Sequence, residues 1–228
     1  MTPAEIELSR FNMIEQQIRP WDVLDAAVLE LLGQVRREQF TPAALRGLAF
    51  MDTEVPLRTP HEAALRQGHC MLAPRVEARS VQDLKLQKTD RVLEIGTGSG
   101  YSAALMASLA ASVLTLEIEA ELAETARANL REAGIANAEV RHADGANGAA
   151  ADGPFDAILL SGSVAAVPAA LLQQLKPGGR LFVIVGNEPM MRAQVVTRVG
   201  EGRFETTSPW DAIVPRLQNF PEPSPFQF

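Results

Sequence analysis

The strongest constraint on this fold is a run of alternating glycines directly after a short apolar segment. Residues 91–95 (RVLEI) predict a buried strand, and Gly96, Gly98 and Gly100 follow it, just before a predicted helix at 101–109. Glycine permits positive φ and lets a ligand approach the backbone closely. The start of the next helix offers unpaired N–H donors. Since open α/β sheets bind ligands at this edge of their strands, the run predicts an α/β fold with a ligand cradle in this loop.

Strands and helices alternate along the rest of the chain, which is typical of crossover units and a parallel sheet. Gly200-Glu201-Gly202 separates two apolar segments and predicts a hairpin, so the last strand pair is expected to be antiparallel. The fold class predicted is a doubly wound, mostly parallel, seven-stranded α/β sheet. Besides 91–95, the predicted strands are 112–117, 138–142, 155–160, 180–185, 193–199 and 203–208, and the helices 74–88, 101–109, 120–133 and 168–175.

The first third of the chain has a different pattern. Residues 4–46 predict helices, because apolar side chains recur at three- and four-residue spacing. Pro20 separates two helices, Asp22 is the expected N-cap of the second, and Pro42 opens a short third one. Residues 51–73 show no period, and a connection of this length is usually functional or mobile. The expected division is a helical extension with a substrate-side loop at 1–74, a ligand-binding domain at 75–220 and an irregular tail at 221–228.

Composition excludes several classes of protein. The 228 residues carry 21 Lys and Arg against 28 Asp and Glu, a net charge of −7, with no basic run longer than Arg36-Arg37. Nucleic acid is therefore not an expected partner. The apolar stretches are far shorter than the ~20 residues that span a bilayer, so no membrane partner is expected. A single cysteine, Cys70, cannot form an internal disulfide, and the N-terminus lacks a secretory pattern. We expect a cytoplasmic protein.

An acidic residue ends the second strand of the predicted sheet. Glu117 can accept hydrogen bonds from both ribose hydroxyls of an adenosine-containing ligand. A dinucleotide fingerprint has its third glycine one place later than Gly100. The spacing therefore argues against an NAD-dependent oxidoreductase, which stays an alternative. Glycines that serve only a tight turn are the other interpretation.

The glycine loop with Glu117 resembles the first two motifs of class I S-adenosylmethionine-dependent methyltransferases. Longer segments are similar to the protein-L-isoaspartate O-methyltransferase family, over roughly residues 9–186. The Glu-Ile-Gly-Thr-Gly-Ser-Gly-Tyr run is the most specific of them. The similar segments are 10–18 (RFNMIEQQI), 35–42 (VRREQFTP), 48–52 (LAFMD), 92–101, 144–145 and 168–186.

This resemblance implies a Rossmann-like methyltransferase sheet and a protein-repair enzyme. Its cofactor would be S-adenosylmethionine, its product S-adenosylhomocysteine, and its acceptor a carboxylate of a protein or peptide. The cofactor contacts implied by the resemblance, together with the loop itself, are Glu94, Gly96, Thr97, Gly98, Ser99, Gly100, Tyr101, Glu117, Asp144 and Gly145.

The chain departs from that family on the substrate side. The family has a Ser-Gln-Pro segment whose serine belongs to the active site. Here Pro74 matches the proline, which places Leu72 at the serine position. Leucine cannot form a side-chain hydrogen bond, so weak activity on isoaspartyl peptides is expected. Ser161 or Thr59 are candidates for a substitute hydroxyl. A different acceptor, including a small molecule, and a non-catalytic cofactor-binding or regulatory protein stay open as alternatives.

The expected chemistry needs few special side chains. A carboxylate is already ionised near pH 7 and requires no general base, so catalysis would come from positioning and exclusion of water. His61 and His69 lie in the long connection without a ligand cluster, and no metal is predicted. Cys70 is expected to be a small buried residue, and Trp210 a packing residue. The acceptor and the oligomeric state are left open.

Overall fold

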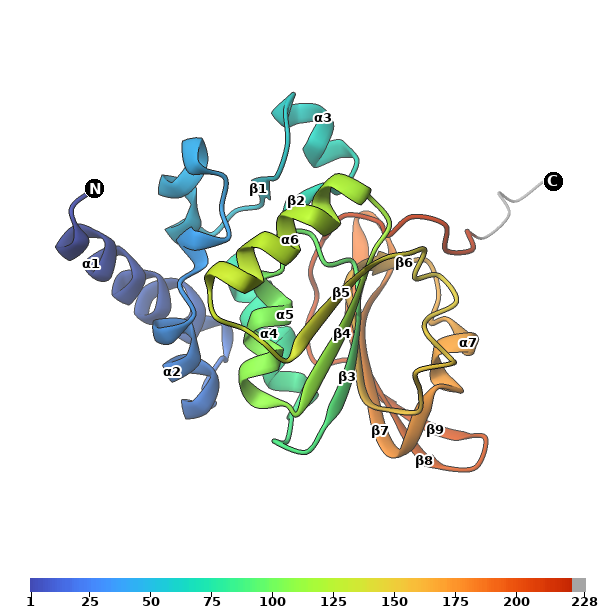
Figure 1. The fold of residues 1–228 in the computed structure, drawn as a ribbon. Coiled ribbons are helices and arrows are strands. Elements are labelled where there is room, and N and C mark those ends of the chain that lie inside the picture. The colour runs from blue at the N-terminus through green and yellow to red at the C-terminus, as the bar shows by residue number, and fades with distance from the viewer. Residues whose placement is uncertain (223–228) are drawn as a thin grey trace.

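A computed structural model describes residues 1–222, and its centre is one twisted seven-stranded sheet (Figure 1). The strand order is β5-β4-β3-β6-β7-β8-β9. Strands β3 to β7 pair in parallel, β8 is antiparallel to β7, and β9 is antiparallel to β8. The predicted fold class and C-terminal hairpin are confirmed. The strands are β3 Arg91–Ile95, β4 Ser112–Glu117, β5 Ala138–His142, β6 Phe155–Val164, β7 Leu175–Asn187, β8 Met190–Gly200 and β9 Arg203–Thr207.

Helices cover both faces of the sheet, so each face has its own apolar core. Figure 1 shows α4 (Pro74–Leu84), α5 (Tyr101–Leu109) and α6 (Ala120–Glu132) on one face and α7 (Ala169–Leu172) on the other. Alternation along the strands supplies both cores. Val92 packs in the cluster that contains the helices α4 to α6, whereas its neighbour Leu93 packs in the cluster on the α7 side.

The N-terminal helices pack onto the first of these cores. Met13, Ile18 and Leu32 are buried in the same cluster as Leu105 of α5. The extension therefore shares its core with the sheet domain. The N-terminal elements are α1 Pro3–Met13, a π-helical turn η1 Ile14–Ile18, a 3-10 turn η2 Arg19–Trp21, α2 Ala26–Gln34, and 3-10 helices η3 Arg37–Gln39 and η4 Ala43–Phe50.

Several predicted boundaries were wrong. Asp25, not Asp22, caps α2, with its side chain accepting from the Ala27 and Val28 amides. Asp22 has φ 58° and ends η2, whereas an N-cap needs extended backbone. The helix predicted to reach 88 ends at Leu84, because Lys85 takes φ 48°. Strands β6 and β7 are longer than predicted, and Pro42 does precede the third helix, η4.

The connection at 51–73 is more ordered than its sequence suggests. It contains β1 (Val55–Pro56) and β2 (Cys70–Met71), which pair antiparallel, with α3 (His61–Arg66) between them. Two-residue strands are too short to produce a periodic pattern, so neither strand was predictable. The predicted irregular tail lies mostly outside the described residues, and Pro221 and Glu222 belong to no helix or strand.

Within residues 1–222, no helix has both the length and the apolar character needed to cross a bilayer. The same part of the chain contains no cluster of three or more His, Cys, Asp or Glu side chains that could hold a metal ion.

Candidate cofactor and acceptor site

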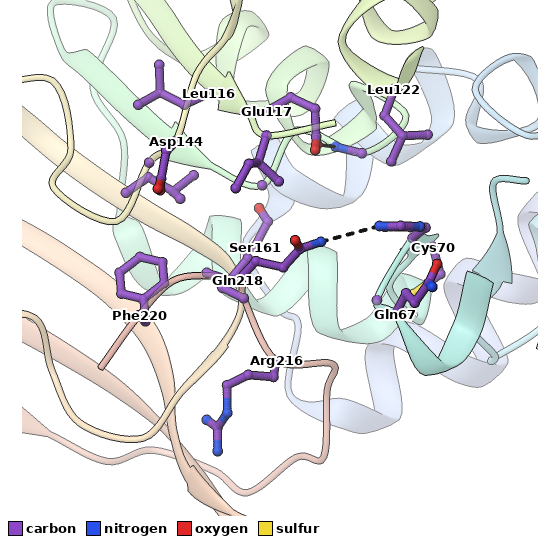
Figure 2. A pocket seen from close by; sticks show the side chains of 18 residues that line it. Gln67, Cys70, Leu116, Glu117, Leu122, Asp144, Ser161, Arg216, Gln218 and Phe220 are labelled. Carbon is purple, nitrogen blue, oxygen red and sulfur yellow. Dashed lines mark hydrogen bonds between the residues drawn. The ribbon is translucent and has the colours of Figure 1, made fainter. Parts of the chain in front are cut away.

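A cleft opens at the carboxyl ends of β3 and β4 (Figure 2). Its walls come from segments that are far apart in the sequence. The glycine loop and the β4–α6 turn form one side, and residues 67–70 of the long connection and residues 216–220 of the C-terminal segment contribute the rest. Asp144, Gly145 and Ser161 complete the lining. This is the edge at which a parallel sheet binds ligands.

The glycine loop and Glu117 are in direct contact, as the sequence predicts for one site. Gly98 has φ 54°, and its N–H donates to Glu117 Oε2 at 2.8 Å. Glu117 Oε1 accepts from the Glu119 N–H at 3.0 Å. Two backbone donors therefore fix the orientation of a carboxylate that lines the cleft.

Gly100 has a different role from the other two loop glycines. It lines neither this cleft nor the smaller cavity beside it. A Cβ at Gly100 would lie 3.3 Å from Leu130 and 3.4 Å from Ala126 of α6. Gly100 is the N-cap residue of helix α5 and has a φ of 87°. Gly100 therefore permits close packing of α5 on α6 and does not face the ligand space.

Asp144 and Gly145 line the same cleft as Glu117. Asp144 Oδ1 accepts from the Ala146 N–H, and Oδ2 accepts from Asn219 Nδ2, both at 2.9 Å. A Cβ at Gly145 would lie 2.5 Å from Ile95 Cγ2, so only glycine allows the chain to pass this close to the end of β3. These contacts bring the loop after β5 into the same cleft as Glu117, and the contact of Asp144 and Gly145 with the cofactor stays a prediction.

Glu94 is buried beneath the cleft and does not line it. Its Oε1 lies 2.7 Å from Ser161 Oγ and its Oε2 lies 2.7 Å from Thr115 Oγ1; the ionised carboxylate accepts from both hydroxyls, and the protonated form donates to one of them. Thr97 Oγ1 lies 2.6 Å from Thr115 Oγ1 and extends the chain of hydroxyls. Burial, with smaller contributions from Glu77 and Glu117, raises the pKa of Glu94 to about 8. Glu94 therefore acts on the site through Ser161.

A second, smaller cavity adjoins the cleft and shares Cys70, Gly96, Gly98 and Ser161 with it. Leu72 lines this cavity, so the structure brings Leu72 and Ser161 to one place. Thr59 is exposed and lines neither space. Of the two candidate hydroxyls, only Ser161 is positioned beside Leu72.

The remaining loop side chains face the smaller cavity or the core. Thr97, Ser99 and Tyr101 line the smaller cavity only. The Tyr101 ring packs edge-on against Phe40 at 5.5 Å and under the Arg37 guanidinium at 5.6 Å. Burial raises the pKa of the Tyr101 hydroxyl. Tyr101 is thus mainly a packing residue.

Arg37 connects this core to the segment at Leu72. Its guanidinium donates to Leu72 O at 2.6 Å and to Ala49 O at 3.0 Å, and its Nε pairs with Glu77 Oε2 at 3.1 Å. Burial raises the pKa of Glu77 to about 7 despite this pairing. Arg37 therefore fixes the backbone of Leu72, whatever the side chain at that position.

Residues 214–220 form a C-terminal segment whose Arg216, Leu217, Gln218 and Phe220 line the cleft, and the sequence did not predict them as part of the site. The Ser163 N–H donates to Pro215 O at 2.8 Å, and the Leu217 N–H donates to Ser163 O at 2.9 Å. Gln218 Nε2 lies 3.4 Å from His69 Nε2, a contact drawn in Figure 2. Tertiary packing brings these residues to the cleft, and their local pattern gives no sign of it.

His69 and Cys70 both line the cleft, and both are buried. Burial, with Arg58 nearby, lowers the pKa of His69. Burial also raises the pKa of the Cys70 thiol. Cys70 is the small buried residue that the sequence predicted, and a thiol held protonated is a poor nucleophile. Trp210, as predicted, packs in the core, stacked on Phe182 at 5.8 Å.

The sheet, the glycine loop and the acidic residue at the end of β4 define a nucleoside-binding α/β protein of the methyltransferase class. The family described as protein-L-isoaspartate(D-aspartate) O-methyltransferase matches residues 9–215. The chain belongs to this family. The match extends well beyond residue 186, where the resemblance seen in the sequence ended, and it includes the first residues of the C-terminal segment.

Curated relatives agree with this assignment. Protein-L-isoaspartate O-methyltransferase 2 of Marinobacter nauticus is 41% identical over 210 residues, which cover 91% of this chain and 92% of that protein. The protein-L-isoaspartate O-methyltransferase of Koribacter versatilis is 37% identical over 213 residues, which cover 93% and 92%. The predicted family and S-adenosylmethionine-dependent enzyme class are confirmed.

Solved structures show the same fold. A Plasmodium falciparum protein-L-isoaspartate O-methyltransferase, in complex with S-adenosyl-L-homocysteine, superposes with a TM-score of 0.75 at 20% identity, over 91% of this chain and 97% of that one. Another protein-L-isoaspartate O-methyltransferase gives a TM-score of 0.77 at 23% identity, over 92% of this chain and 66% of that one. The predicted cofactor, S-adenosylmethionine, agrees with this family.

The cleft fits an adenosyl cofactor. Glu117 has an oriented carboxylate that would accept from ribose hydroxyls, and Leu116 and Ile118 on either side of it, with Leu122, give apolar surface. Gly96 and Gly98 line the cleft, and a Cβ at Gly96 would lie only 2.9 Å from Leu217 Cδ2, so Leu217 packs directly against the loop at this point. When bound, the cofactor supplies an electrophilic methyl group. The glycine loop and Glu117 would hold and orient it.

Replacing Glu117 with alanine is expected to weaken binding of S-adenosylmethionine by about 1–3 kcal/mol, the usual value of hydrogen bonds to a charged group. Titration calorimetry measures this directly. Because the variant also loses the Gly98 contact, Glu117→Gln and the thermal midpoint of each variant separate binding from stability. Glu139→Ala, which removes an exposed carboxylate on β5, is the matched control. Unchanged affinity in Glu117→Ala would disprove the ribose assignment.

The raised pKa of Glu94 predicts a pH-dependent stability. The folded chain keeps this proton up to about pH 8, whereas the unfolded chain loses it near 4.5. The free energy of unfolding is therefore expected to fall between pH 5 and 8, by on the order of 1 kcal/mol per pH unit. Glu94→Gln should remove this contribution, because an amide can bond both hydroxyls without titrating. Urea unfolding across this pH range tests it; parallel curves for the two proteins would contradict the prediction.

Proposed function

We propose that this chain transfers the methyl group of S-adenosylmethionine to a carboxylate oxygen of a protein or peptide, with isoaspartyl residues as the acceptor class. The proposal rests on the polar groups at the wall that the cleft and the smaller cavity share. Ser161 lies there, and the carboxyl group bonded to it, Glu94, is buried and does not line the cleft. Burial raises the pKa of Glu94 to about 8, and a carboxyl group that keeps its proton is not a general base.

The other polar groups at this wall support the same conclusion. The Cys70 thiol has a raised pKa, and Glu77 is buried and paired with Arg37. An acceptor that arrives already ionised needs no proton removed. A carboxylate meets this condition at neutral pH, whereas an alcohol or a thiol requires a base or a metal. The residues then contribute positioning and removal of water from the nucleophile.

The direct test uses cofactor with a labelled methyl group and a peptide containing one isoaspartyl residue. We expect slow labelling that mild base releases as methanol, because methyl esters hydrolyse in base. The same peptide with a normal aspartyl residue is the control and should stay unlabelled. Base-stable label would contradict carboxyl transfer. Tight NADH binding with none for the sulfonium would overturn the cofactor as well.

A second candidate function is a cofactor-binding protein without catalysis. Leu72, which puts an apolar side chain at the family's serine position, favours it. Cofactor binding without labelling of any protein in an aged cell extract would support this alternative.

We place the protein in the cytoplasm, because its one cysteine cannot form an internal disulfide.

A further inference from the structure

Arg216 stands out among the residues of the cleft. Of the described residues that line it, Arg216 is the one Lys or Arg. Figure 2 shows its guanidinium on the far side of Gln218 from Glu117 and Asp144. The cleft therefore has an acidic end, which matches the hydroxyls of the cofactor, and a separate cationic end.

Neutral groups at the sheet edge hold the Arg216 guanidinium in place. Its Nη2 donates to Gly186 O at 3.0 Å and to Asn187 Oδ1, at the end of β7. Its Nη1 lies 3.4 Å from Ser163 Oγ, near the end of β6. These partners orient the guanidinium without neutralising its charge. An oriented arginine matches the planar geometry of a carboxylate.

The countercharge of Arg216 comes from the end of the described chain. Glu222 Oε1 lies 2.9 Å from Arg216 Nε, and the Glu222 side chain is 52% exposed. Ion pairs this exposed contribute only about 0–1 kcal/mol. Glu222 follows Pro221 and belongs to no helix or strand. A carboxylate from another molecule can replace it at little cost.

We propose that Arg216 recognises the carboxylate of the acceptor peptide, and that Glu222 occupies the same guanidinium as an internal competitor until the acceptor binds. The inference rests on the proposed function. Glu117 and Asp144 make the rest of the cleft acidic, so an anionic acceptor needs a cation there. Arg216 provides it on the side away from the cofactor's hydroxyls.

The same arrangement accounts for release of the product. In the transfer, a carboxylate oxygen forms a bond to the methyl carbon, the carbon–sulfur bond breaks, and its electron pair stays on sulfur. The acceptor becomes a neutral ester and loses its charge attraction to Arg216. Glu222 keeps its charge and returns to the guanidinium.

The test is steady-state methylation of the isoaspartyl peptide by the full chain, read as base-labile label. Arg216→Gln is expected to raise KM by about 10- to 100-fold, the range for loss of a hydrogen-bonded charge, and to leave cofactor affinity unchanged. Glu222→Gln should lower KM by up to about fivefold. In the Arg216→Gln background, Glu222→Gln should have no further effect. Arg192→Gln, which breaks an exposed pair with Asp211 outside the cleft, is the matched control.

The outcomes separate the inference from the proposed function. If the wild type methylates the peptide and both single variants have the wild-type KM, the role of Arg216 is overturned and carboxyl transfer stands. A fall in KM from Glu222→Gln that persists in the Arg216→Gln background overturns the competition. No base-labile label in the wild type overturns the proposed function and this inference with it. Since Glu222 is exposed, its variant gives a result even where Arg216→Gln does not fold.

Discussion

Gly98→Val is expected to abolish binding of S-adenosylmethionine while the chain stays folded. Gly98 has φ 54°, lines both cavities and donates its N–H to Glu117. A β-branched residue resists this left-handed conformation, at a cost of about 1–2 kcal/mol or more. A Cβ itself would find ordinary contacts, 3.4 Å from Leu57 and 3.5 Å from Cys70 O. The additional methyl groups of valine would compete with the ligand for the space in front of the loop.

Calorimetry should show an affinity loss of at least about 100-fold, equivalent to ~2.7 kcal/mol. Gly202→Val is the matched control, because Gly202 also has positive φ, at 62°, but a Cβ there meets nothing within 4 Å. Gly202 lies in the β8–β9 turn, outside the cleft. Circular dichroism should show both variants folded. Normal binding by a folded Gly98→Val protein would mean that the loop is not the cofactor cradle.

Local signals account for the parts of the fold that the sequence predicts well. Strands β3, β4 and β5 match their predicted limits; β3 and β4 are mostly apolar, and β5 follows the glycine that ends helix α6. The hairpin between β8 and β9 was visible in its two glycines. The two-residue strands β1 and β2 left no trace, because their pairing depends on residues that are distant in the sequence: Val55 pairs with Met71, 16 positions away, and Pro56 with Cys70, 14 positions away.

The candidate site also contains residues that the sequence predicts and residues that only the folded chain brings together. Gly96, Gly98 and Glu117 were predictable, because chain order alone brings adjacent parallel strand ends together. Arg216 and His69 were not, since they come from segments that meet only in the folded chain. Glu94 shows a further limit. Its place in the motif suggested a ligand contact, but its side chain faces the helices and bonds Ser161 and Thr115.

Leu72→Ser is expected to increase turnover on an isoaspartyl peptide by about 10-fold or more. The resemblance in sequence places Leu72 where an active-site serine is expected, and a site that recognises a polar acceptor loses much of its selectivity without such a partner. Leu72 lines the smaller cavity beside Ser161, so a hydroxyl there would face the same space. Arg37 holds the Leu72 carbonyl at 2.6 Å, which keeps the backbone in place when the side chain changes.

The variant also removes a side chain that is 9% exposed and belongs to the core, so a loss of stability of about 2–3 kcal/mol is expected. Leu72→Ala separates the two effects, because it leaves a similar space without a hydroxyl. A gain in Leu72→Ser but not in Leu72→Ala would assign the effect to the hydrogen bond, and equal gains would assign it to the added room. Robust wild-type turnover with no gain in Leu72→Ser would show that Leu72 does not limit this reaction. Ser161, bonded to Glu94 at the same wall, would then be the hydroxyl that serves the acceptor.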